Sequence, residues 1–197
     1  IMRKSIFILS AFAGIIGVAV AACTNTSANI EKTTAAKDSA ARVLRGEYLV
    51  STIGCDDCHS PKRFTANGPE IIPELRLSGF PHNGKTPEVN TAEVQKGWAL
   101  LAPDLTSAVG PWGQSFAANI TSDATGIGNW NEEQFIYAIR NGKLKGMESS
   151  RPILPPMPWT IYKNMTDEDL KSIFAYLKTT KPVENVVPAP KSLQDLH

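Results

Sequence analysis

Three stretches of the chain place apolar residues at the spacing of an amphipathic helix. We predict helices over residues 40–53, 131–142 and 166–178, because apolar side chains recur in each at intervals of three and four positions. Asn131 and Thr166 stand at the start of the second and third stretches and are residue types that cap helix N-termini. The pattern therefore predicts a mainly α-helical domain.

The first predicted helix carries an apolar face formed by Leu44, Tyr48 and Leu49. Gly46 lies within the same helix, where a glycine lowers helical stability relative to alanine. A glycine at such a position also lets another helix approach closely, because it has no Cβ. Both interpretations of Gly46 are compatible with the sequence.

Residues 60–118 contain no long periodic run. They hold 7 Pro and 6 Gly in 59 residues, which predicts loops, turns and at most brief helices or strands. A structureless loop of this length is unusual inside a compact domain, so we expect the segment to pack as a lobe. Its expected anchors are large apolar side chains: Trp98, Leu100, Leu101, Trp112 and Phe116.

The amino-terminal end has the pattern of a targeting segment. Arg3 and Lys4 precede an uncharged, mostly apolar run over residues 6–22, and small residues stand directly before Cys23. This ending resembles the lipobox of bacterial lipoproteins, in which the cysteine is lipidated and becomes the first residue of the mature protein. The alternative is an uncleaved membrane anchor, for which 17 residues is a short span. Either interpretation exports the rest of the chain and tethers it to a membrane.

These signals divide the chain into four parts. We expect a signal peptide over residues 1–22, a flexible polar tether over 23–41, the folded domain over 42–182 and a tail over 183–197. The tail is either extended and packed on the domain or loose. Without its first 22 residues the chain keeps 18 of its 20 basic side chains against 19 acidic ones. The chain therefore lacks the excess of positive charge that would favour nucleic acid as a partner.

The segment Cys55–His59 reads Cys-Asp-Asp-Cys-His, which is the pattern of covalent haem attachment. Two thiols three positions apart can each add across a vinyl group of one haem, and His59 can then offer a ring nitrogen to the iron. A thioredoxin-like redox pair, a zinc site and a structural disulfide are the alternatives. A thioredoxin-like pair needs a strand before the motif, and residues 48–54 could form one. The pattern nevertheless favours haem, and no second CxxC or HxxxH completes a zinc site.

A second iron ligand is expected in the proline-rich segment 153–159. Its prolines hold the backbone extended and stiff, so the Met157 thioether can face a metal with little loss of entropy. Thioether sulfur raises the reduction potential of a haem when it is paired with histidine. Met147 and Met165 are alternative ligands, and His82 offers a histidine pair. Ordinary core packing is a further use of Met157.

The order of helix, CxxCH motif, capped helix, Pro-Met segment and final helix resembles the class I, monohaem c-type cytochromes, over about residues 42–182. Gly46 and Tyr48 on the first helix, and Phe174 and Tyr176 on the last, match the crossing of that family's terminal helices. The resemblance implies a mainly α fold of the class I cytochrome c type. A long loop-rich insertion would separate the CxxCH motif from the axial methionine.

Three further segments are similar to the haem modules of membrane-bound bacterial dehydrogenase cytochrome c subunits: residues 123–130, 135–142 and 155–158. Those subunits usually carry several CxxCH motifs, whereas this chain has one. The segment 60–118 also exceeds what small class I members have between the haem motif and the methionine.

These observations predict electron transfer rather than catalysis. We expect a membrane-anchored protein on the periplasmic side with one haem c, attached by Cys55 and Cys58 and ligated by His59 and Met157. Its expected partners are redox proteins: a dehydrogenase, a quinol-oxidising complex or a terminal oxidase. The alternatives are a haem enzyme or small-ligand sensor with an open distal site, peroxidase-like in activity, and a lipoprotein with metal- or thiol-based chemistry.

Overall fold

The computed structural model describes residues 36–196. The chain separates into two units, Ile1–Ala41 and Arg42–His197, and the second holds the folded domain. The expected signal peptide, Cys23 and the tether up to residue 35 lie outside the described residues. Across residues 36–196, none of the helices combines the length and the apolar character that crossing a bilayer requires.

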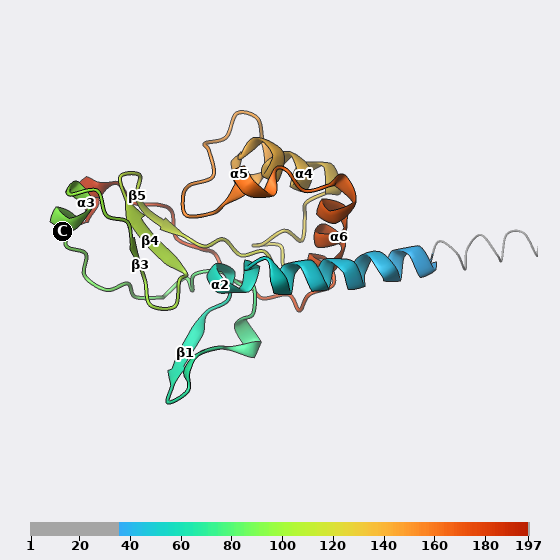
Figure 1. Ribbon diagram of the computed structural model, residues 1–197, viewed down its shortest axis with the longest axis horizontal. Helices are drawn as coiled ribbons and strands as arrows, with labels where there is room; N and C mark the ends of the chain where they lie inside the picture. Colours follow the sequence, from blue (N-terminus) through green and yellow to red (C-terminus); the bar gives the residue numbers. More distant parts are fainter. Residues whose placement is uncertain (1–35, 197) are drawn as a thin grey trace, which may run out of the picture. The chain divides into compact units, whose positions relative to one another are not determined.

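Helices form most of the regular structure, as the periodicity predicts (Figure 1). A first helix covers residues 36–52 and is followed by α2, Cys55–His59. After the insertion, the chain forms α4, Glu132–Asn141, the short α5, Trp159–Tyr162, and α6, Asp167–Leu177. The helices expected near 131–142 and 166–178 are therefore confirmed.

The caps of α4 and α6 are those that the sequence predicts. The Asn131 side chain accepts a hydrogen bond from the Gln134 amide at 2.7 Å, and the Thr166 hydroxyl accepts one from the Asp169 amide at 3.1 Å. Gly142 ends α4 in the left-handed region at φ 61°, a conformation that glycine adopts at little cost. Local signals alone thus set both helix starts.

Close approach of α6 determines the buried face of the first helix. A Cβ built on Gly46 would lie 1.9 Å from the Ser172 carbonyl oxygen and 2.7 Å from Cβ of Tyr176. Leu49 is buried beside this crossing, whereas Leu44 and Tyr48 are 66% and 60% exposed. The predicted apolar face was therefore wrong for two of its three residues, because the contact is centred on a residue without a side chain.

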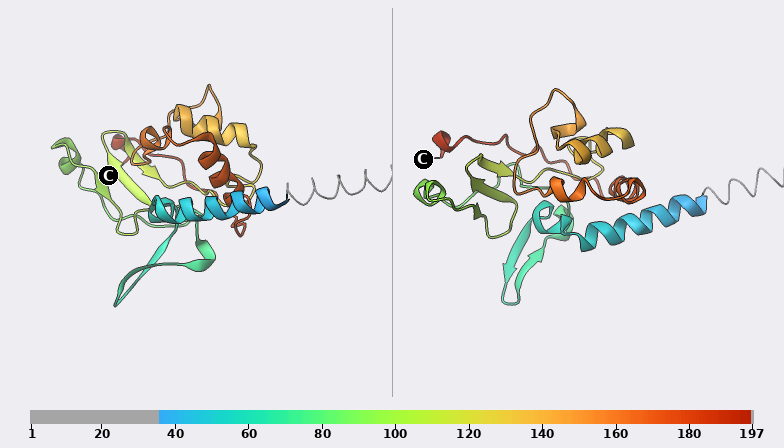
Figure 2. Two further views of the ribbon diagram at one scale, coloured as in Figure 1. Left: turned by 45° about the vertical axis from the view of Figure 1, so that its right-hand side comes forward. Right: turned by 45° about the horizontal axis from the view of Figure 1, so that its top comes forward.

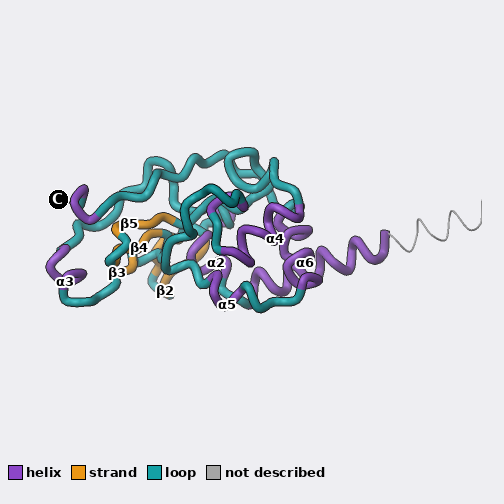
Figure 3. Tube along the Cα trace, turned by 90° about the horizontal axis from the view of Figure 1, so that it is seen from above, coloured by secondary structure: helices purple, strands orange, loops and turns teal. Residues whose placement is uncertain are grey.

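The insertion, residues 60–118, folds into two small sheets. Strands β1, Lys62–Thr65, and β2, Gly68–Ile71, form an antiparallel hairpin that projects from the domain in both views of Figure 2. Strands β3, Leu100–Leu101, β4, Ser107–Gly110, and β5, Gly113–Phe116, form a three-stranded antiparallel sheet in that order. The insertion also contains a 3₁₀ turn, Pro73–Leu75, and the short α3, Thr91–Gln95. Figure 3 shows the β3–β5 sheet beside the helices.

The anchors of the insertion differ from those expected. Trp98 and Leu101 are 64% and 55% exposed, because they lie in the turn after α3 and on the short outer strand β3. Phe116 does anchor the insertion, since its ring packs against Phe80 with centroids 4.7 Å apart. The fully buried apolar residues are smaller or earlier in the segment: Leu77, Phe80, Val94, Ala108 and Val109.

The carboxyl-terminal tail is packed against the insertion, which decides between the two alternatives for residues 183–197 over their described part. The buried Asn185 side chain donates to the carbonyls of Ser78 and Phe80 at 2.7 and 2.9 Å and accepts from the His82 amide at 2.8 Å. Further along, Lys191 forms a β-bridge with the buried Gln114. Backbone and side-chain bonds therefore hold the tail in place.

Candidate functional site

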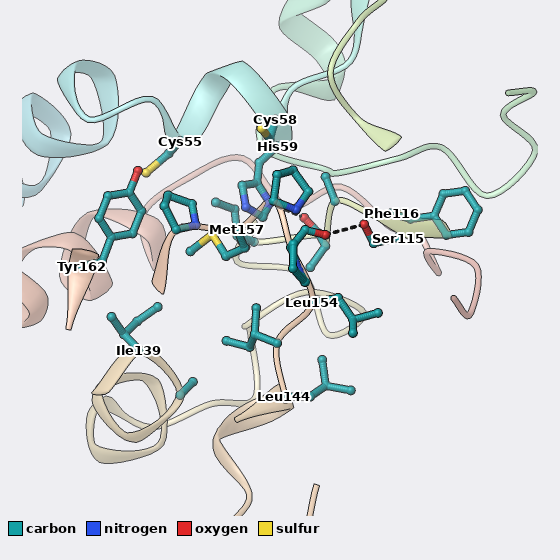
Figure 4. Close-up of a pocket in the computed structure, with 18 of the residues that line it drawn as sticks. Cys55, Cys58, His59, Ser115, Phe116, Ile139, Leu144, Leu154, Met157 and Tyr162 are labelled. Atoms are coloured by element: carbon teal, nitrogen blue, oxygen red, sulfur yellow. Dashed lines mark hydrogen bonds between the residues drawn. The ribbon is translucent and has the colours of Figure 1, made fainter. Parts of the chain in front are cut away.

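One cavity of about 220 Å³ gathers the chemistry-bearing residues. Its walls come from α2, from the β4–β5 part of the insertion, from α4 and α6, and from the segment 153–158 (Figure 4). Most of the lining side chains are apolar, among them Ile127, Phe135, Ile139 and Leu177. Such a cavity suits a flat apolar group that is held at a few defined points.

The CxxCH motif lies on one short helix that faces this cavity. The chain enters α2 through Gly54 at φ 87°, in the left-handed region, and leaves it through Ser60 in an extended conformation. Residues at positions i, i+3 and i+4 share a helix face, so Cys55, Cys58 and His59 all line the cavity. Neither cysteine is in a disulfide.

The imidazole of His59 is oriented by the insertion. Its Nδ1 lies 2.7 Å from the Ala118 carbonyl oxygen, and because a carbonyl can only accept, Nδ1 carries the proton. Nε2 is then the unprotonated nitrogen, with a lone pair available to a metal. Burial lowers the pKa of His59, so the neutral, metal-binding form is favoured. This arrangement is typical of an axial ligand with an oriented ring.

Met157 lines the same cavity although it lies almost a hundred residues further along the chain. The Pro155–Pro156 peptide bond before it is cis. The Ser115 hydroxyl of β5 donates to the Pro155 carbonyl at 2.6 Å, and the Trp159 amide donates to the Met157 carbonyl at 2.9 Å. The insertion therefore contacts the methionine segment as well as the histidine.

The alternative ligands are arranged differently. Met147 is 49% exposed and does not line the cavity, and the exposed His82 also lies outside it. Met165 does line the cavity, just before α6. Two methionines are thus present in the cavity, and only Met157 lies in the rigid proline segment.

Burial also affects the two thiols and a neighbouring phenol. It raises the pKa of Cys55 to about 12, with a further contribution from the Asp56 carboxylate, and it raises the pKa of Cys58. Tyr162 lines the cavity and donates to the Ile53 carbonyl at 2.6 Å, and burial raises its pKa to about 12. All three groups are therefore protonated at neutral pH. Tyr162 was not predicted from the sequence.

A polar network holds α2 from the side away from the cavity. Arg76 pairs with Asp56 at 2.7 Å and donates to the Tyr176 hydroxyl at 2.7 Å. The buried Ser60 hydroxyl donates to Asp56 at 2.7 Å and accepts from the Leu77 amide at 2.9 Å. These bonds join the haem-motif helix to the insertion and to α6. Their partners are far apart in sequence, so no local pattern could have identified them.

Several known proteins are similar to this chain in sequence, and all three described below are cytochrome subunits of dehydrogenases. No family model matches the chain. The fructose dehydrogenase cytochrome subunit of Gluconobacter japonicus is 30% identical over 178 residues, which is 89% of this chain and 28% of that protein. The gluconate 2-dehydrogenase cytochrome c subunit of Pantoea cypripedii is 28% identical over 156 residues, 79% of this chain and 26% of that protein.

A third relative is the cytochrome c subunit of the alcohol dehydrogenase (quinone) of Gluconobacter oxydans, 26% identical over 152 residues. These residues are 76% of this chain and 24% of that subunit, so the chain spans about a quarter of the length of the curated relatives it matches. The residues present fit a covalent haem, because two thiols and an oriented imidazole share one face of a helix over an apolar cavity. The similarity to these subunits and the pair of cysteines in the CxxCH motif together imply haem c. The chain is a distant homologue of the cytochrome c subunits of dehydrogenases.

Proposed function

We propose that this protein transfers electrons through a single covalent haem c. In this proposal Cys55 and Cys58 attach the macrocycle, and His59 and Met157 are the axial iron ligands. The observation that carries it is the shared cavity, which is lined by all four side chains although Met157 is distant in sequence. The relatives support the same class of function, since each is named as the cytochrome subunit of a dehydrogenase.

The haem would supply one-electron exchange at its iron, and the chain's residues would keep that exchange fast. The bond from His59 to Ala118 fixes the ring orientation, and the proline segment limits the movement of Met157. Ligands that stay in place in both oxidation states keep the reorganisation small. The apolar side chains around the site would keep water from a bound haem, and this would raise its reduction potential.

We also propose the setting in which the protein works. Its partners are redox proteins: a dehydrogenase, which the names of the relatives favour, a quinol-oxidising complex or a terminal oxidase. Lipidation of Cys23 would hold the domain over residues 42–182 at the periplasmic face of a membrane. Confinement to one surface raises the effective concentration of the partners.

The test is a visible spectrum with a redox titration of the holoprotein. Met157→Ala is expected to abolish the low-spin methionine-ligated spectrum and to lower the potential, because the thioether ligand is lost. Met165→Ala is the matched control, since this residue lines the same cavity, and it should leave the ligation spectrum unchanged. The reduced wild-type protein should not bind carbon monoxide readily at neutral pH.

Three outcomes would contradict the proposal. An unchanged spectrum in Met157→Ala would favour a haem enzyme or a sensor with an open distal site. Loss of the methionine signature in Met165→Ala alone would assign the second ligand to that residue instead. Mass spectrometry of the mature protein provides the check on attachment, because a mass without added haem would leave only thiol- or metal-based chemistry.

A further inference from the structure

Lys62 makes an unusual set of contacts three residues after the CxxCH motif. Its ammonium donates to the carbonyl oxygens of Asp57 at 2.6 Å, Asp104 at 2.9 Å and Ser60 at 3.1 Å, and the Asp56 carbonyl is 3.4 Å away. Lys62 is half-buried at the start of β1. An ammonium has three donor hydrogens, so these carbonyls satisfy it fully.

Each of the three shorter contacts is made to the neighbour of a cavity-lining residue. The Asp57 carbonyl precedes Cys58 and the Ser60 carbonyl follows His59. The Asp104 carbonyl precedes Leu105, where the insertion enters the cavity wall. Lys62 therefore joins the end of the haem-motif helix to the part of the insertion that enters the cavity wall at Leu105, through a single charged group.

The charge of Lys62 has no carboxylate partner within the described part of the chain. All of its hydrogen bonds go to backbone carbonyls, and none of the ion pairs there includes it. Arg76, the other cation beside α2, differs in this respect, since its charge is paired with Asp56 at 2.7 Å. Carbonyl dipoles reduce the cost of burying an ammonium but leave its full unit charge in place.

We propose that Lys62 is a positioning residue that fixes the CxxCH helix against the insertion, and that its unpaired charge raises the reduction potential of the haem. The inference rests on the proposed electron-transfer function and deepens it. Oxidation adds one positive charge at the iron, and a nearby fixed cation disfavours that state. Because the ammonium is half-buried, salt screens this effect less than it would screen a surface charge.

The experiment is a redox titration of the holoprotein with Lys62→Met, Lys62→Arg and the control Lys96→Met. Lys96 is an exposed lysine of the insertion that pairs with Glu93. Lys62→Met should lower the potential with the methionine-ligated spectrum intact, at both low and high salt. Lys62→Arg should stay close to wild type because it keeps the charge, and Lys96→Met should not differ from wild type.

Hydrogen exchange of the backbone amides tests the positioning role without any redox measurement. Lys62→Met should speed exchange in residues 55–60 and 104–108, and Lys62→Arg should restore part of the protection. If Lys62→Met does not fold, Lys62→Gln retains two donor hydrogens without the charge and should show the same fall in potential.

Failure of the proposed electron-transfer function can be distinguished from failure of the role proposed for Lys62. A wild-type protein without a reversible redox couple overturns the proposed function itself. A normal couple in wild type with an equal potential in Lys62→Met overturns the electrostatic role of Lys62 alone. Unchanged hydrogen exchange in Lys62→Met overturns its positioning role.

Discussion

The helices and the insertion contribute to the same cavity by different physical means. The helices start at local caps and bury periodic faces, so their side chains supply most of the apolar wall. The insertion has little periodicity and contributes single contacts from both backbone and side chains: the Ala118 carbonyl accepts from His59, and the Ser115 hydroxyl donates to the Pro155 carbonyl. A segment that resembles an added lobe in sequence is thus one wall of the site.

The largest effect is expected where two helices of the frame touch. In Gly46→Val the new side chain would overlap the backbone of Ser172, so the crossing must separate. We expect the free energy of unfolding to fall by about 3 kcal/mol or more. A fall of that size would leave much of the protein unfolded at about 37 °C. Chemical denaturation measures it, with the exposed neighbour Glu47→Ala as the control. A loss equal to that of the control would mean that α6 does not approach the first helix this closely.

A smaller effect is expected where the tail holds the insertion. Asn185→Ala would leave the carbonyls of Ser78 and Phe80 and the amide of His82 without their partner. Unsatisfied buried groups of this kind cost about 2–3 kcal/mol together. Limited proteolysis should also cleave the insertion before the helices, because the damage is confined there. Val186→Ala, at an exposed neighbour, is the control. Simultaneous cleavage of both parts would contradict this separation.

The smallest effect is expected at the contact between the insertion and the methionine segment. Ser115→Ala removes the bond to the Pro155 carbonyl and should cost about 1 kcal/mol. The informative measurement is the methionine-ligation band of the holoprotein. In Ser115→Ala this band should be weaker than in wild type, or it should disappear at a lower temperature because the iron loses the methionine ligand. Ser149→Ala, at an exposed serine, provides the comparison. An unaltered band would show that the proline segment holds Met157 without the sheet.

Sequence reasoning succeeded where the signal is local. Asn131 and Thr166 predict the starts of α4 and α6, because a capping side chain bonds to a backbone amide only a few residues away. It failed for Leu44 and Tyr48, because the face of a helix is chosen by its partner and here the partner contacts Gly46. The prediction for Trp98 was also wrong, because this residue follows the short α3 in a turn and its side chain stays exposed.

The site divides in the same way. The residues expected to bind haem were predicted from their chemistry and spacing, and the structure brings Cys55, Cys58, His59 and Met157 to one cavity, while their binding of haem stays a prediction. The groups that orient them were not found, because a backbone carbonyl such as that of Ala118 carries no residue-type signal. Lys62 was likewise missed, since a lysine in a loop-rich segment is usually a solvated charge.

The tail has a consequence for the order in which the chain can fold. Asn185 bonds to residues more than a hundred positions earlier, and Pro190 lines the cavity. During synthesis from the amino end, the insertion emerges long before the residues that complete its hydrogen bonds. The helices can pair once α6 is made, but the insertion reaches its final bonding only after Asn185 and Lys191 have been added. A nascent chain that stops before Asn185 would therefore carry the complete CxxCH motif beside an unfinished wall.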